Sequence, residues 1–74
     1  MNYQATIRKG KVEMTFIVAD CGWGQDWART RAIYHFIVKQ GIGPHYLESP
    51  KQAVARMTGL ADDPITAELR EIKP

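Results

Sequence analysis

The stretch "DDPITAELREIKP", residues 62–74, decides between two folds for this chain. Its Asp-Pro pair is typical of a helix start, and Ile65, Leu69 and Ile72 have the spacing of one helical face. As a strand, the same stretch places Ile65, Ala67 and Leu69 in alternation with polar residues, with Ile72 out of phase. Local signals favour the helix, so a strand has to be justified by what the rest of the chain needs.

Residues 3–9 and 11–19 give that justification, because both alternate apolar and polar residues with period two. Gly10 lies between them and suits the positive φ of a tight turn, which predicts a β-hairpin. An isolated hairpin is only marginally stable, whereas a third strand gives a sheet that can carry helices. We therefore predict a strand over residues 64–72, in an α+β domain of order β-β-α-α-β with an antiparallel sheet packed by helices on one face. The alternative is a hairpin followed by three helices.

A helix is predicted over residues 25–40, ended by Gly41 and Pro44. Its broad apolar arc consists of Trp27, Thr30, Ile33, Tyr34, Ile37 and Val38, with Phe36 at the edge. The opposite arc carries Ala28 and Ala32 together with three basic residues. This arrangement predicts that the aromatic and branched residues, and not the alanines, face the sheet.

A shorter helix is predicted to open at Ser49 and to end at Gly59. Ser49 is a good N-cap, Pro50 occupies the first helical position, and Gln52 completes a capping box. Its inward positions are expected to be Ala53, Val54 and Met57.

The composition is that of one small globular domain, residues 1–74. Hydrophobic residues make up 45% and charged residues 24%, which argues against a disordered chain. The net charge of +2 is unevenly divided: residues 1–40 hold six basic and three acidic residues, giving +3, and residues 41–74 hold four and five, giving −1. Any anionic partner is therefore expected to bind the first half.

Cys21 is the single cysteine, so no internal disulfide can form. No charged-then-apolar leader and no membrane-length apolar run is present, which favours a cytoplasmic location without membrane contact. Catalysis by Cys21 would need a base, but His35 lies about 15 Å along the predicted helix from its start, and His45 could reach the thiol only by an excursion of its loop. We expect Cys21 to be a half-buried hydrophobic residue, and we expect no enzyme activity. We also expect no metal site, because paired ligand spacings are absent, and no cofactor.

The two tryptophans are predicted to differ in role. Trp27 lies on the apolar arc and is expected to anchor the core. Trp23 stands between two glycines ahead of the helix, where two roles are open. It either folds back on the first turn as a hydrophobic staple or protrudes as an anchor for a partner.

A basic stripe is the clearest one-sided feature, because Arg31, His35 and Lys39 are spaced four residues apart on one helix face. Such a stripe is either a solvated surface or a docking strip for acidic protein or for phosphates. Three further cations at the hairpin turn would extend it if they lie nearby: Arg8, Lys9 and Lys11.

From Lys51 onward the residue order resembles a DNA-binding helix-turn-helix over about twenty residues. Ala55 falls in the first helix and Gly59 in the turn, and the packing positions are Leu60, Ile65 and Leu69. The resemblance implies a small DNA-binding regulator that uses residues 51–72. The chain departs from the pattern at Thr58, where a larger apolar residue is usual. The second helix would also carry four acidic residues that oppose phosphate: Asp62, Asp63, Glu68 and Glu71.

We predict a non-catalytic intracellular binding protein that engages a macromolecular partner through Trp23 and the basic stripe. The partner would be a protein or a nucleoprotein complex, and direct nucleic-acid contact would be weak. Accessory modulators and phage-type inhibitors of nucleic-acid-processing machinery are the matching class. A homo-oligomer is a further option, because Ile17 breaks the alternation toward the open face of the sheet, beside a free edge.

Overall fold

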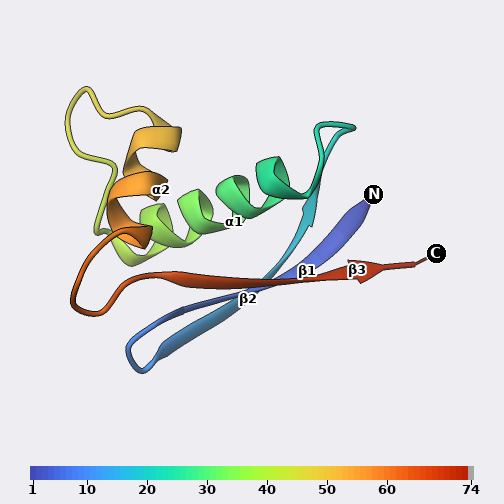
Figure 1. The fold of residues 1–74 in the computed structure, drawn as a ribbon, viewed down its shortest axis with the longest axis horizontal. Helices are drawn as coiled ribbons and strands as arrows, with labels where there is room; N and C mark the ends of the chain where they lie inside the picture. The colour runs from blue at the N-terminus through green and yellow to red at the C-terminus, as the bar shows by residue number, and fades with distance from the viewer. Residues whose placement is uncertain (74) are drawn as a thin grey trace.

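The computed structural model describes residues 1–73 and contains three antiparallel strands in one sheet and two helices (Figure 1). The elements follow one another as β1 (Asn2–Lys9), β2 (Val12–Ala19), α1 (Gln25–Gln40), α2 (Pro50–Thr58) and β3 (Thr66–Ile72). The α+β class is thereby confirmed. The alternative of a hairpin followed by three helices is wrong, because residues 1–73 contain only two helices.

The hairpin of β1 and β2 turns through Gly10 and Lys11, with Gly10 at φ 60. Pairing is continuous from Lys9↔Val12 to Asn2↔Ala19. Alternation along each strand puts one set of side chains under the helices, and the most buried of these are Tyr3, Ala5, Ile7 and Val18. Figure 1 shows both helices on this side of the sheet. The other face stays open, and Ile17 on it is 65% exposed and not covered.

The residues from Thr66 to Ile72 form a strand because they pair with the edge of β1 that β2 leaves open. The order is β2-β1-β3, so β3 pairs along β1 with Leu69 opposite Ala5 and Ala67 opposite Ile7. Ile65, just before the strand, is 2% exposed, and its N–H donates to the carbonyl of Met57 at 3.1 Å. These tertiary contacts outweigh the local helical spacing. The helix-turn-helix interpretation is therefore wrong, since its second helix does not exist.

Helix α1 faces the sheet with its small residues, which corrects the predicted orientation. Ala28 and Ala32 are fully buried, together with Ile33, Phe36 and Ile37. Fully buried Ala5 on β1 is likewise small, and short side chains on both elements let the helix lie close to the sheet. Ile33, Phe36 and Ile37 are the larger side chains that α1 places in the core. Trp27 is 38% and Val38 50% exposed, so the prediction that these two residues face the core is wrong.

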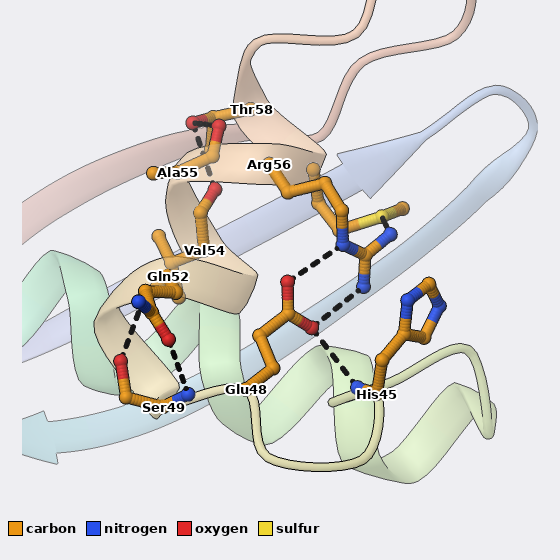
Figure 2. A network of polar contacts seen from close by, with 9 residues as sticks. His45, Glu48, Ser49, Gln52, Val54, Ala55, Arg56 and Thr58 are labelled. Carbon is orange, nitrogen blue, oxygen red and sulfur yellow. Dashed lines mark hydrogen bonds and ion pairs between the residues drawn. The ribbon is translucent and has the colours of Figure 1, made fainter.

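Helix α2 begins as predicted. The Gln52 N–H donates to Ser49 Oγ, the Ser49 N–H donates to Gln52 Oε1, and Pro50 occupies the first turn (Figure 2). Ala53, Val54 and Met57 are buried. The capping box fixes the start of the helix and so sets which face meets the core.

The loop before α2 is held by one carboxylate. Glu48 accepts hydrogen bonds from Arg56 Nε at 2.8 Å and Nη2 at 3.1 Å, and from the N–H of His45 at 2.9 Å (Figure 2). The Arg56 guanidinium, and secondly the His45 N–H, lower the pKa of the Glu48 carboxyl to about 2. The negative charge of Glu48 therefore links the loop to the helix.

Replacing Glu48 by Gln is expected to lower the melting temperature by roughly 5 °C at neutral pH, because the charge-assisted bonds to Arg56 are lost. A carboxyl whose folded pKa is depressed stabilises the fold fully above its ordinary pKa and loses that effect as pH falls through the folded value. Thermal unfolding should therefore show that the wild type melts at a higher temperature than Glu48→Gln. This difference in melting temperature should be constant above about pH 5 and gone near pH 2. An advantage that does not change with pH would contradict this role, and Glu13→Gln serves as the exposed control.

Candidate functional site

The corner between β2 and α1, residues 20–24, is fixed by a buried carboxylate. Asp20 is 6% exposed and accepts the N–H of Gly22 at 3.0 Å and the terminal ammonium group of Met1 at 3.0 Å. The N–H of Trp23 donates to the Asp20 carbonyl at 2.8 Å. The Gly22 N–H first, and the ammonium group second, lower the pKa of the Asp20 carboxyl. The corner thus has an internal support that holds its backbone in one conformation.

Asp20 was missed by the sequence analysis, although a signal was present. An aspartate two residues before a glycine is the pattern of an Asx turn, in which the side chain accepts a backbone N–H two residues on. Gly22 and Gly24 lie at φ 82 and 98, as such a reversal requires. The glycines therefore belong to the turn geometry of the corner.

Trp23 projects from this corner. Its side chain is 74% exposed, so no hydrophobic staple forms and one of its two predicted roles is removed. Arg31 lies with its guanidinium carbon 5.3 Å from the centroid of the Trp27 ring, a cation–π distance. Two partly or largely exposed indole rings thus belong to the same end of α1 as the first cation of the stripe.

Cys21 is exposed, which contradicts the expected half-buried position. It lies in the corner at φ 51, and the fixed turn keeps its side chain outside the core. Arg31 Nη1 is 3.8 Å from its Sγ. The guanidinium thus approaches both the thiol and the Trp27 ring, and these two contacts orient the first cation of the stripe.

The basic flank, defined as Arg31, His35 and Lys39, runs along β2. All three side chains are exposed. The His35 ring packs on Phe16 of β2 at a centroid distance of 4.7 Å, and one residue beyond Lys39, Gln40 Nε2 lies 3.1 Å from Sδ of Met14. A hollow of about 390 Å3 lies between helix and strand, lined by Phe16, Ile17, Val18, Ala19, Arg31 and His35. Arg31 and His35 of the flank therefore lie beside β2, which is an edge strand of the sheet.

The cations near the hairpin turn do not simply extend the flank. Arg8 pairs with Glu13 at 3.2 Å and Glu68 at 3.6 Å, on the face of the sheet away from the helices. Lys9 pairs with Asp63 at 2.6 Å. Lys11 is exposed and makes no ion pair with residues 1–73. Arg8 and Lys9 are therefore engaged internally, whereas Arg31 and Lys39 of the flank form no ion pair with an acidic side chain of residues 1–73.

A second exposed apolar feature, Tyr46 and Leu47, was not anticipated. These side chains are 92% and 85% exposed, on the loop held by Glu48. Nothing in the local pattern distinguishes them, and their loop is joined to α2 by the Glu48–Arg56 contact between residues eight apart. A separate hollow of about 470 Å3 lies on the side of α1 that faces α2. It is lined by Trp27, Thr30, Arg31, Tyr34 and Pro50.

Within residues 1–73, no group of three His, Cys, Asp or Glu side chains is placed to hold a metal ion. No helix in this range has the length and apolar character required to cross a bilayer.

Comparison with known proteins gives no relative: no family model matches the chain, and neither the curated proteins nor the solved structures contain a significant match. The geometry of the corner and the flank is accordingly the basis for assigning a function.

Proposed function

We propose that this chain is a non-catalytic binding protein that engages an acidic protein surface through Trp23 and the basic flank. One observation carries the proposal: the Trp23 side chain is 74% exposed on a corner whose backbone is held by buried Asp20. A chain of 74 residues has few large hydrophobic residues to spare from its core. Tryptophan presented on a fixed backbone is the residue type in which interface energy concentrates.

The flank supports an acidic partner. Arg31 and Lys39 carry full positive charges, and among residues 1–73 no acidic side chain forms an ion pair with either of them. Opposite charges across an interface accelerate encounter and select the partner. A protein fits better than nucleic acid, because Arg8 and Lys9 are already paired and the flank itself contributes only Arg31 and Lys39 as permanent cations, too few for tight phosphate binding. The single free thiol is in keeping with a reducing compartment, so a cytoplasmic modulator is part of the proposal.

Trp23→Ala and the triple variant Arg31→Ala, His35→Ala, Lys39→Ala are expected to remain folded and to lose the partner. Truncating a tryptophan at the centre of an interface weakens binding roughly 30-fold or more. Capture from native lysate, quantified against immobilised wild-type chain and repeated after nuclease treatment, measures the loss. A matched control removes three exposed cations elsewhere: Arg29→Ala, Arg70→Ala and Lys73→Ala.

Retention by the control and loss by both test variants, unchanged by nuclease, is the predicted outcome. A partner that both folded test variants retain at wild-type level would contradict the proposal, as would retention that disappears with nuclease.

A further inference from the structure

The outer edge of β2 has no strand partner within residues 1–73, since β1 lies on its other side. In an antiparallel pair closed by a two-residue turn, the residues flanking the turn exchange hydrogen bonds, and such pairs alternate with unbonded ones. Lys9 and Val12 flank this turn. The alternation leaves the backbone N–H and C=O groups of Glu13, Thr15 and Ile17 directed away from β1. These groups form a template for a further strand.

This edge lacks the usual protection against pairing. β2 has eight residues in unbroken register, without proline or bulge, and Glu13 is its only charged residue. Edge strands are normally blunted by charges, prolines or bulges. β3, the other edge, has three charged residues among seven: Glu68, Arg70 and Glu71. The comparison identifies β2 as the edge open to an incoming chain.

The basic flank matches the repeat of an added strand. Residues four apart on a helix are separated by about 6 Å along its axis. Side chains on one face of a strand recur every two residues, about 6.8 Å apart. The contacts of His35 with Phe16 and of Gln40 with Met14 show that α1 follows β2. Three alternate side chains of a strand beside β2 would therefore meet Arg31, His35 and Lys39 in turn.

Charge decides between an acidic peptide and a second copy of this chain. Pairing two β2 edges about a twofold axis would bring two basic flanks together on the same face of the joined sheet, and like charges in contact disfavour that arrangement. An acidic strand has the complementary charge. Its other face would lie beside Thr15 and Ile17, which favours β-branched neighbours.

We infer that the edge of β2 accepts an extended acidic peptide as a fourth, antiparallel strand, with acidic side chains at alternate positions against Arg31, His35 and Lys39. The inference rests on the proposed function and specifies the partner segment. Backbone hydrogen bonds to β2 supply affinity, and the flank supplies selectivity for acidic residues. Trp23, four residues beyond the end of β2, lies where the added strand leaves the sheet.

A synthetic heptapeptide, acetyl-Thr-Glu-Val-Glu-Val-Glu-Thr-amide, provides the probe. Its control of equal composition, acetyl-Val-Val-Thr-Glu-Glu-Glu-Thr-amide, has the same charge without alternation. Titration followed by amide chemical shifts is expected to show binding of the alternating peptide and at least fivefold weaker binding of the control. Equal binding of the two peptides would overturn the inference.

Backbone methylation of the peptide tests strand addition directly. In the antiparallel arrangement the valine N–H groups face β2, and the glutamate N–H groups face away. N-methylation of the two valine amides should weaken binding tenfold or more, and N-methylation of two glutamate amides should change it little. Any other pattern would contradict the added strand.

A charge swap tests the flank. The variant Arg31→Glu, His35→Glu, Lys39→Glu is expected to bind the heptapeptide with an affinity that is lower by roughly tenfold or more. It should instead bind the version of the peptide in which lysine replaces glutamate. Arg29→Glu, Arg70→Glu and Lys73→Glu change the net charge by a similar amount and should leave binding within about twofold. Amide spectra of both variants without peptide establish that they are folded. Undiminished binding by the flank variant would refute the inference.

Failure of this inference is separable from failure of the proposed function. If the lysate partner depends on Trp23 and the flank but the heptapeptide shows no shifts at about 1 mM, strand addition is wrong and the binding function stands. If substitutions of Trp23 and of the flank leave binding of the lysate partner unchanged, the proposed function itself is wrong.

Discussion

Phe36→Ala is expected to destabilise the folded chain by about 3–5 kcal/mol. Phe36 is the largest of the fully buried side chains, and it lies on α1 within the core formed with the sheet. A domain of this length has a total stability of about 4–11 kcal/mol, so this one truncation removes a large part of it. The cavity it leaves is lined by rigid elements, which limits relaxation.

Urea unfolding at 25 °C measures the effect as a large fall in the midpoint with little change in slope. Val38→Ala is the matched control on the same helix, because Val38 is 50% exposed, and it should stay within about 0.5 kcal/mol of wild type. Similar losses for the two variants would show that α1 does not face the sheet through Phe36.

Ala32→Leu is expected to destabilise the chain by about 1–3 kcal/mol, although leucine is a good helix former. Ala32 on α1 is fully buried, and it belongs to the same core cluster as Ala5 of β1, the strand against which α1 packs. Three additional carbon atoms at this contact must displace either the helix or its neighbours. The melting temperature should fall by roughly 5–20 °C.

Ala55→Leu separates packing from helix propensity, because Ala55 is exposed on α2. We expect the melting temperature of Ala55→Leu to stay within a few degrees of wild type. An Ala32→Leu variant as stable as Ala55→Leu would contradict the close approach of α1 to the sheet.

The parts of the fold that depend on residues close together in the sequence could be predicted from it. Gly10 between two alternating segments specifies the hairpin, and the Ser49, Pro50 and Gln52 pattern specifies the start of α2. The strand over Thr66–Ile72 followed from a tertiary requirement, since a hairpin alone buries too little surface. Its local helical spacing would have given the wrong element.

The rotation of α1 could not be obtained in the same way. Hydrophobicity places Trp27 and Val38 inward and the alanines outward, but Ala28 and Ala32 are the residues that become fully buried when α1 packs on the sheet. That packing is set by the sheet, which lies far from α1 in sequence. The loop that carries exposed Tyr46 and Leu47 is likewise joined to α2 by a contact between residues eight apart, Glu48 and Arg56.

The candidate site was partly predictable. The spacing of Arg31, His35 and Lys39 determines that they share one face of α1. Their position beside the edge of β2, however, follows from how the helix packs. The pairing of Arg8 and Lys9 with acids near and far in sequence also emerges only in three dimensions. Exposure of Trp23 was one of two open alternatives, and the Asp20 turn explains which one occurs.

The most direct test of the account is a map of amide and indole chemical-shift changes when the alternating acidic heptapeptide is added to the wild-type chain. The account predicts changes at Thr15 and Ile17, at the Trp23 indole and along Arg31, His35 and Lys39, which weaken as salt is raised. Changes centred instead on Tyr46, Leu47 and the start of α2, with the edge of β2 and the flank unaffected, would contradict it.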